Sequence, residues 1–169
     1  MKQIVLSLAP LPAELVKAFI QQTPGVPDFE VAAGHDLTGE ELAEAFTRAD
    51  VVLGDYTFKQ GISSDLLAGA RSLKLIQQPS VGYQHIDAAA CRAAGIRLAN
   101  TPGANTISVA EHTVAWGLCL LRNLFAAQES MREGRWEQLG IKPVELSGKT
   151  WGLVGLGRIG RAVALRLGP

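Results

Sequence analysis

Residues 150–160 read TWGLVGLGRIG, an apolar run that leads into the pattern G-x-G-x-x-G. In a strand–turn–helix unit with this pattern, the first glycine allows a tight turn, the second lets the backbone approach a pyrophosphate, and the third lets the helix pack closely on the strand. The helix that follows points the positive end of its dipole at the anion. We therefore predict a strand at 149–154, a helix at 158–167, and a dinucleotide-binding turn between them rather than a mere tight turn.

The sequence ends at Pro169, before a second strand of that dinucleotide-binding domain. The acidic residue that holds the ribose normally follows the glycine turn by about 20 residues. We therefore expect a truncated domain at residues 146–169, the start of a Rossmann fold that has the phosphate-binding turn and lacks the ribose contact.

Composition and charge favour an ordinary globular protein. Lys+Arg and Asp+Glu both number 16, so the formal net charge is zero, and no basic run favours nucleic acid or an anionic membrane as a partner. The apolar run at the amino terminus is too short for a signal peptide, and residues 114–121 are too few for a membrane span. Cys91 and Cys119 lie among small and apolar residues, which predicts buried, reduced thiols in a cytoplasmic protein.

Short apolar runs alternate with helical patterns over the first hundred residues. We predict strands at 3–8, 29–33, 51–54, 73–77 and 96–99, and helices at 12–22, 39–48, 64–70 and 87–94. Strands buried on both faces and joined by helices imply a parallel sheet. The expected fold class is α/β, a flavodoxin-like doubly wound domain over residues 1–102.

Three helix ends in this region carry local signals. Thr38 and Glu41 have the spacing of a capping box, Asp87 is placed to cap the fourth helix, and Gly95 is placed to end that helix in the left-handed conformation.

The stretch TPGAN at 101–105 interrupts the alternation and is the expected domain boundary. One long helix is predicted from Thr106 to about Met131, because apolar residues recur there with helical spacing. About 25 helical residues rise roughly 37 Å, enough to pass from one domain to the next. Residues 103–145 are therefore assigned to an interdomain helix and linker.

Ligands of parallel sheets bind beyond the carboxyl ends of the strands. In the loop at 79–83, Gly82 would expose successive backbone N–H groups that can hold a carboxylate or a phosphate. A strand-to-helix turn without a ligand explains the same residues. Asn105 precedes the long helix, and its spacing fits an N-terminal cap at least as well as a ligand contact.

Four motifs in this order resemble the D-isomer-specific 2-hydroxyacid dehydrogenases. They are SVGYQHID at 80–87, GIRLANTPG at 95–103, NTISVAEH at 105–112 and LSGKTWGLVGLGRIG at 146–160. The resemblance covers essentially the whole chain. It implies an NAD(P)-dependent oxidoreductase that transfers a hydride between nicotinamide and a small 2-hydroxy or 2-oxo acid. It also implies a homodimer formed through the region after residue 105.

The resemblance assigns site residues position by position. Val81, Gly82 and Tyr83 would offer backbone amides to the substrate carboxylate, with Val81 bordering the nicotinamide. Asn105 would contact substrate, as in the formate dehydrogenase branch, and Val109 would pack near the nicotinamide. The cofactor pyrophosphate would meet the turn residues Gly155, Gly157, Arg158, Ile159 and Gly160.

No catalytic residue and no metal ligand is assigned within the chain. The family's catalytic Arg, Glu and His would lie beyond Pro169, so the chain alone is expected to be inactive and to bind NAD only in the millimolar range or more weakly. Gln84 and His85 replace the Asp-Asn pair common in the family, so the substrate is left open. His85 and His112 are interpreted as structural residues. Glu111 and Asp87 are interpreted as capping or supporting groups.

Two other classes of protein were weighed. Asp55, just after the third strand, would suit a phosphorylated receiver domain, but the acidic pair after the first strand and the Lys after the fifth strand are missing. The second class is a non-catalytic dinucleotide- or protein-binding module, like the family's corepressor branch, or an inactive fragment.

Overall fold

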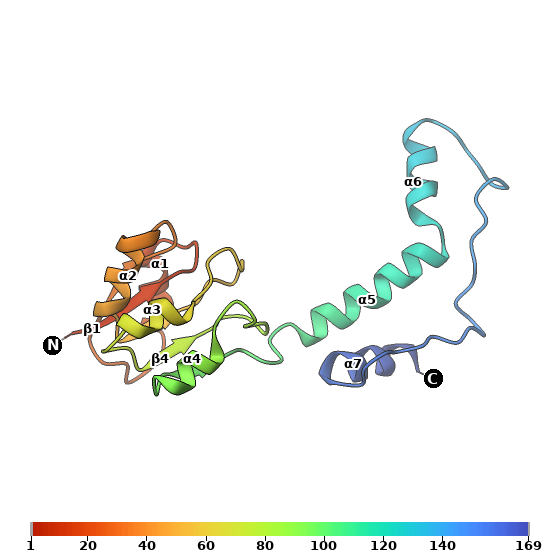
Figure 1. Ribbon diagram of the computed structural model, residues 1–169. Coiled ribbons are helices and arrows are strands. Elements are labelled where there is room, and N and C mark those ends of the chain that lie inside the picture. Colours follow the sequence, from red (N-terminus) through yellow and green to blue (C-terminus); the bar gives the residue numbers. More distant parts are fainter. Residues whose placement is uncertain (1, 169) are drawn as a thin grey trace. The chain divides into compact units, whose positions relative to one another are not determined.

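The structure is a computed structural model that describes residues 2–168. It divides into two compact units, the first ending at Ala104 and the second beginning at Asn105. The first unit, coloured red to green in Figure 1, contains a five-stranded sheet whose strand order is β2-β1-β3-β4-β5, with every pairing parallel. Its strands are β1 (Gln3–Ser7), β2 (Phe29–Ala33), β3 (Val51–Leu53), β4 (Leu75–Gln77) and β5 (Arg97–Ala99). The predicted flavodoxin-like, doubly wound α/β fold is confirmed.

Four helices connect these strands: α1 (Ala13–Gln21), α2 (Gly39–Arg48), α3 (Ser64–Gly69) and α4 (Ala88–Ala93). Because crossovers between parallel strands are right-handed, the direction of each crossover decides which face its helix covers. The step from β1 to β2 runs one way along the sheet and the later steps run the other way. Helix α1 is therefore expected on one face, with α2, α3 and α4 on the other.

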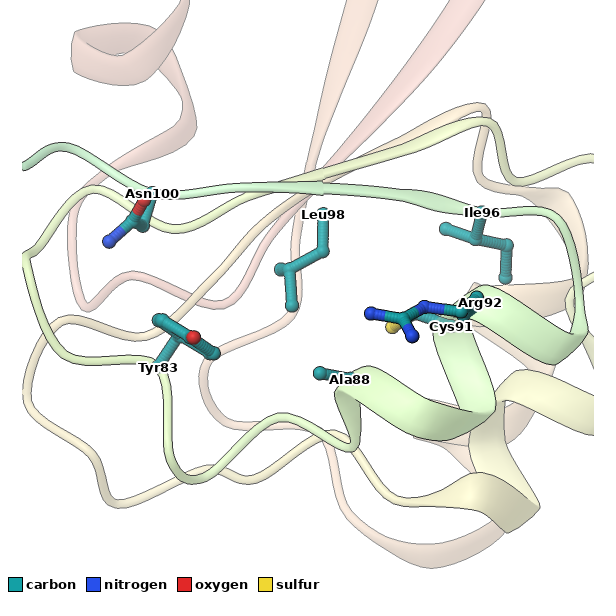
Figure 2. Close-up of a pocket in the computed structure, with 7 residues that line it drawn as sticks. All are labelled: Tyr83, Ala88, Cys91, Arg92, Ile96, Leu98 and Asn100. Carbon is teal, nitrogen blue, oxygen red and sulfur yellow. The ribbon is translucent and has the colours of Figure 1, made fainter.

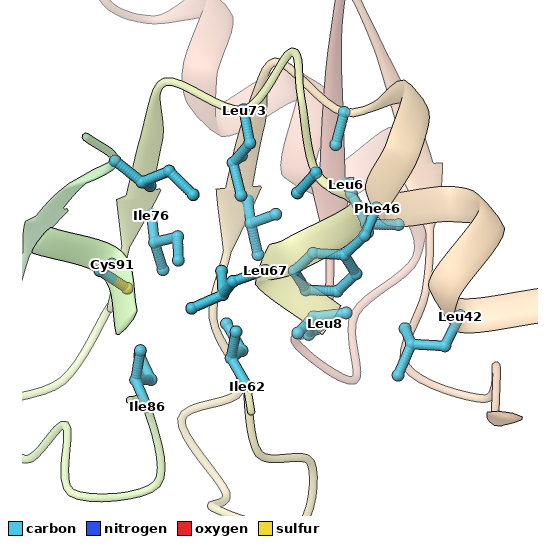
Figure 3. Close-up of a cluster of buried hydrophobic side chains, with 14 residues drawn as sticks. Leu6, Leu8, Leu42, Phe46, Ile62, Leu67, Leu73, Ile76, Ile86 and Cys91 are labelled. Carbon is cyan, nitrogen blue, oxygen red and sulfur yellow. The ribbon is translucent and has the colours of Figure 1, made fainter. Parts of the chain in front are cut away.

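The main core lies under α2, α3 and α4. Leu6, Val52 and Ile76 are partners in the strand register and form a buried row across the sheet. Phe46 of α2 and Leu67 of α3 pack against this row (Figure 3). The alternation of side chains along the strands puts large apolar groups on this face, which fixes the register of the sheet.

Two of the three helix-end signals are confirmed. The Asp87 carboxylate accepts a hydrogen bond from the Ala90 N–H at 2.8 Å, and Gly95 has a φ of +70°. The capping box is wrong: Thr38 lies at the N-cap position of α2, but its side chain makes no cap bond. Gly39 begins the helix with a φ of +53°, and this left-handed start departs from the backbone geometry that a capping box requires.

The second unit contains α5 (Thr106–Leu121), α6 (Leu124–Arg132) and α7 (Arg158–Leu167). The single helix predicted over 106–131 is therefore wrong. Asn123 lies between α5 and α6 with a φ of +50°, and a left-handed residue cannot continue a right-handed helix. Its side-chain Nδ2 donates to the carbonyl oxygen of Lys142 at 2.8 Å, which ties the break to a distant part of the chain.

The strand predicted at 149–154 does not form, although α7 follows as predicted. Backbone N–H and C=O groups of a strand need a partner strand, and the second unit has none among residues 105–168. Leu153 and Val154 are exposed. Trp151 instead lies against α5 at Gly117, where an added Cβ would collide with its ring. The small core of this unit consists of Ala110, Ala162 and Val163.

The two cysteines differ in burial, and both are free. Cys91 is buried as expected, and its burial together with the nearby Asp87 carboxylate raises the pKa of its thiol, which keeps it protonated. Cys119 is only partly buried, so the expectation of burial is wrong for it. Among residues 2–168 there is no helix with both the length and the apolar character needed to cross a membrane.

The core packing yields a prediction on stability. Phe46 is 0% exposed, whereas Phe19 on α1 is 57% exposed. We expect Phe46→Ala to lower the free energy of unfolding by about 3–5 kcal/mol, because it removes a buried ring and leaves a cavity. Phe19→Ala should change it by no more than about 0.5 kcal/mol. Urea unfolding followed by far-UV circular dichroism measures both, and equal losses would contradict the assigned core.

Candidate functional site

The loop after β4 has three consecutive carbonyl groups tied to the rest of the first unit. The Ser80 carbonyl oxygen accepts from the Thr101 N–H at 3.0 Å. The Val81 carbonyl oxygen accepts from Asn100 Nδ2 at 2.8 Å, and the Gly82 carbonyl oxygen accepts from the Ser80 hydroxyl at 2.9 Å. Both Asn100 and Thr101 follow β5, so the neighbouring strand supplies two of the three donors.

The N–H groups of Val81, Gly82 and Tyr83 make no hydrogen bond to any part of the chain within residues 2–168. Each of these N–H groups shares a planar trans peptide with one of the tied carbonyls, so it points the opposite way. Three successive N–H groups without a partner in the chain are candidates for binding an anion such as a carboxylate. Residues 81–83 are called the donor loop below.

Tyr83 also lines a hollow of about 350 Å³ between α4 and β5, whose walls include Arg92 and Asn100 (Figure 2). Figure 2 shows Tyr83 and Asn100 at one end of this hollow and the Arg92 guanidinium at the other.

Asp55 holds the loop that follows β3. Its carboxylate is 3% exposed and accepts from the N–H groups of Thr57, Lys59 and Gln60 at 2.7, 2.9 and 3.0 Å, and from the Thr57 hydroxyl. Burial alone would raise the pKa of Asp55, but these hydrogen bonds outweigh it and lower the pKa below its usual range. With both oxygens engaged, the carboxylate lacks the free oxygen that a phosphorylated receiver site needs.

The Asp55 loop presents Phe58 to the donor loop. An added Cβ on Gly82 would lie 3.3 Å from the Phe58 ring, a tight contact, and 2.8 Å from the side-chain oxygen of Gln84. The Phe58 ring also meets the His85 ring edge to face, with 4.8 Å between centroids. Both His85 ring nitrogens are buried and make no hydrogen bond within residues 2–168. His85 thus packs against Phe58 of the Asp55 loop, and its interpretation as a structural residue stays a prediction.

In the second unit, the glycine turn has the local geometry that its sequence predicts. Gly155 has a φ of +94°, which favours glycine. An added Cβ on Gly160 would collide with the Gly155 carbonyl oxygen, whereas Gly157 faces open space. Gly157 is the N-cap of α7 and provides no side-chain cap. Arg158, Ile159 and Gly160 form the first turn of α7, whose backbone N–H groups therefore fit an anionic pyrophosphate.

Asn105 and Val109 also belong to the second unit. Asn105 is the N-cap of α5, but its side chain is exposed and makes no cap bond. The interpretation of Asn105 as a side-chain cap of α5 is therefore wrong. Val109 is partly buried in the first turn of α5.

The remaining polar residues named from the sequence have partners inside the second unit. His112 Nε2 accepts a hydrogen bond from Trp116 Nε1. Glu111 pairs with Arg166 of α7 at 3.0 Å, which ties α5 to α7. Over residues 2–168, the His, Cys, Asp and Glu side chains form no group of three that could hold a metal ion.

The sequence reasoning missed the residues that support the donor loop. Gln78 follows β4, and its side chain joins the Asp55 loop to Ser80. The signal was the polar stretch QQPS at 77–80, directly after an apolar strand. A buried polar residue at the carboxyl end of a parallel strand can support a ligand loop, but the sequence alone does not say which of these side chains turns inward.

The family model that matches the chain is "D-isomer specific 2-hydroxyacid dehydrogenase, catalytic domain", over residues 4–147. A similar relative is D-3-phosphoglycerate dehydrogenase of Methanocaldococcus jannaschii, 41% identical over 83% of this chain and 26% of the relative. Hydroxypyruvate reductase of Thermotoga maritima is 36% identical over 82% of this chain and 44% of the relative. The chain thus spans from about a quarter to less than half of the length of these curated relatives.

Solved structures show the same likeness. NAD-dependent formate dehydrogenase from Staphylococcus aureus, in complex with NAD, matches with a TM-score of 0.79 at 31% identity, covering 98% of this chain and 53% of that one. NADPH-dependent glyoxylate/hydroxypyruvate reductase from Sinorhizobium meliloti, in complex with citrate, matches with a TM-score of 0.74 at 27% identity, covering 98% of this chain and 50% of that one.

The hydrogen bonds at Asp55 predict a pH-dependent contribution to stability. We expect Asp55→Asn to lower the free energy of unfolding by about 1–3 kcal/mol at pH 7, because the amide NH₂ cannot accept from the loop N–H groups. The folded pKa of Asp55 lies below its ordinary value of 3.8, so its contribution is present above that pH and is lost as the pH falls through the folded pKa. The difference between wild type and variant should therefore hold at pH 5–7 and shrink below about pH 4.

Urea unfolding across this pH range measures the difference. Asp65→Asn, at an exposed position in the first turn of α3, is the control and should show no comparable loss. A difference between wild type and Asp55→Asn that persists unchanged at the lowest pH would contradict the role assigned to the carboxylate.

Proposed function

The chain belongs to the D-isomer specific 2-hydroxyacid dehydrogenase family, and from that premise we propose that the protein serves NAD(P)-dependent hydride transfer between nicotinamide and a small 2-hydroxy or 2-oxo acid. The observation that carries the proposal is the donor loop, with three fixed N–H groups that match a carboxylate. Relatives named for phosphoglycerate and hydroxypyruvate act on acids that share this group.

In this proposal the donor loop binds and orients the substrate carboxylate. The N–H groups of Val81, Gly82 and Tyr83 are held in place before the ligand arrives, so binding costs little reorganisation. Asn105, whose amide is exposed and makes no cap bond, is proposed as a further polar contact for the substrate.

The glycine turn is proposed as the cofactor site. The open space at Gly157 and the uncapped start of α7 fit a pyrophosphate, with Gly155 and Gly160 supporting the turn. Val81 and Val109 are proposed to border the nicotinamide, and Arg158 and Ile159 to meet the pyrophosphate. A bound nicotinamide would supply the site that donates or accepts the hydride. Named neighbours include both an NAD-dependent and an NADPH-dependent enzyme, so the proposal covers either cofactor.

The residues of this chain are proposed to bind and orient rather than to move the proton. The Arg, Glu and His that the family resemblance implies for catalysis have no counterpart assigned within residues 1–169. We accordingly expect the purified 169-residue chain to show no turnover of glyoxylate or hydroxypyruvate with either reduced nicotinamide cofactor.

A titration of the ¹⁵N-labelled chain tests the two binding sites separately. Oxalate, a dicarboxylate that imitates a 2-oxo acid, should shift the amide signals of Val81, Gly82 and Tyr83. NAD should shift those of residues 155–160, with a Kd of about 1 mM or weaker, because the chain has no assigned ribose contact. Acetate is the control for a general carboxylate effect.

Oxalate shifts that avoid the donor loop would overturn the substrate half of the proposal. NAD shifts that avoid the glycine turn would overturn the cofactor half. Micromolar NAD binding with no effect of oxalate would instead favour the non-catalytic dinucleotide-binding module.

A homodimer is proposed from the apolar surface of the second unit. Trp116, Leu120, Leu124 and Phe125 are all exposed on α5 and α6, and the rings of Trp116 and Phe125 lie 5.4 Å apart. An apolar patch of this kind on a water-soluble surface favours association. We propose that α5 and α6 of two copies, together with residues 150–167, cover one another.

We expect sedimentation at micromolar concentration to show a dimer of the 18.0 kDa chain or a larger species. Leu120→Glu should shift the distribution toward monomer, because Leu120 is 65% exposed within the patch and a carboxylate there would be buried on association. Phe19→Glu, on α1 of the first unit, is the control and should leave the dimer intact. A monodisperse monomer of the wild-type chain would contradict the proposal.

A further inference from the structure

Gln78 lies at the carboxyl end of β4 and is 0% exposed. Its side-chain Nε2 donates to the Ser80 hydroxyl oxygen at 2.7 Å and to the Asp55 carbonyl oxygen at 3.2 Å. The Ser80 hydroxyl donates onward to the Gly82 carbonyl oxygen at 2.9 Å. A continuous chain of hydrogen bonds thus joins the Asp55 loop to the donor loop.

The protons in this chain can be placed without ambiguity. Nε2 carries two hydrogens, and the hydroxyl of Ser80 carries one, which the Gly82 carbonyl accepts. If the Gln78 amide were turned over, its oxygen would face the Asp55 carbonyl oxygen, and two acceptors would oppose each other. The observed orientation leaves the Gln78 Oε1 atom buried and without a hydrogen-bond partner within residues 2–168.

Gly54 is the residue that leaves space for this amide. An added Cβ at Gly54 would collide with Gln78 Oε1. Gly54 is not among the glycines with a positive φ, so close approach, rather than backbone conformation, explains the glycine. The sequence therefore keeps space for a buried amide whose oxygen is left unbonded.

A buried oxygen without a partner destabilises the fold relative to an apolar side chain of similar shape. The two hydrogen bonds of Nε2 stabilise the fold, and the unbonded oxygen offsets part of that gain. Their other consequence is the position of the donor loop. The Gly82 carbonyl and the Tyr83 N–H belong to one planar peptide, so whatever fixes the carbonyl also aims the N–H. The peptides of the Val81 and Gly82 N–H groups are held separately, by Thr101 and Asn100.

We propose that Gln78 is a positioning residue that aims the Tyr83 N–H at the substrate carboxylate, acting through Ser80 and accommodated by Gly54. This inference rests on the proposed function of the donor loop. It extends that function by assigning one of its three donors to a buried support that does not touch the ligand.

Gln78→Met tests the inference, because methionine keeps the length of the side chain and removes its hydrogen bonds. We expect the ¹⁵N order parameter of the Tyr83 amide to fall while those of Val81 and Gly82 change little. The oxalate Kd should rise about five- to tenfold, the loss expected for one hydrogen bond. The thermal midpoint should fall only slightly, because the unbonded oxygen is removed together with the two hydrogen bonds of Nε2. Gln21→Met, at an exposed position of α1, is the control and should alter neither the Tyr83 amide nor the Kd.

Gly54→Ala provides a second test from the other side of the contact. It should displace the Gln78 amide and lower the ¹⁵N order parameter of the Tyr83 amide, as in Gln78→Met. In a Gln78→Ala background the same change should have no further effect on the loop, because the colliding atom is gone. Gly69→Ala is the control, since an added Cβ there would lie 3.7 Å from its nearest neighbour, an ordinary contact.

The outcomes separate this inference from the proposed function. If wild type binds no oxalate, the function of the donor loop fails, but the order parameters still report on Gln78. An unchanged Tyr83 amide in Gln78→Met would overturn the positioning role even if oxalate binds. A large fall in thermal midpoint with an unchanged loop would overturn it too, because Gln78 would then serve only the core.

Discussion

The planarity of the peptide bond is the constraint on which the candidate site depends. Each paired carbonyl of residues 80–82 fixes the direction of the next N–H, which points the opposite way, so three hydrogen bonds leave three fixed donors without a partner in the chain. A flexible loop with the same residues would lose this alignment. The donors that hold the loop come from Ser80 and from Asn100 and Thr101 after β5, so the site requires β4 and β5 to end side by side.

That requirement is met by the parallel sheet. Leu6, Val52 and Ile76 bury one face and fix the register of β1, β3 and β4, so all three strands end at the same edge. Asp55 and Gln78 lie directly beyond those ends and are almost wholly buried. The apolar core thereby determines where the polar supports of the donor loop meet.

The second unit shows how far a local motif can form without its sheet. Gly155 is left-handed and Gly160 lies against the Gly155 carbonyl, as the glycine pattern predicts, yet residues 149–154 pair with no strand. The turn and the start of α7 depend on backbone conformation within a few residues. A strand depends on a partner strand that is often distant in sequence. The prediction made from this stretch is therefore correct for the turn and wrong for the strand.

The sequence by itself determined the strand and helix order of the first unit, the glycine turn and the family resemblance, because these follow from periodicity and from residues a few positions apart. The tertiary structure alone decided the helix break at Asn123, which a distant Lys142 carbonyl supports, and the loss of the Thr38 cap. It also decided the role of Gln78. Two adjacent glutamines look alike in a sequence, and only packing against Gly54 and Ser80 shows which one is buried and which groups it holds.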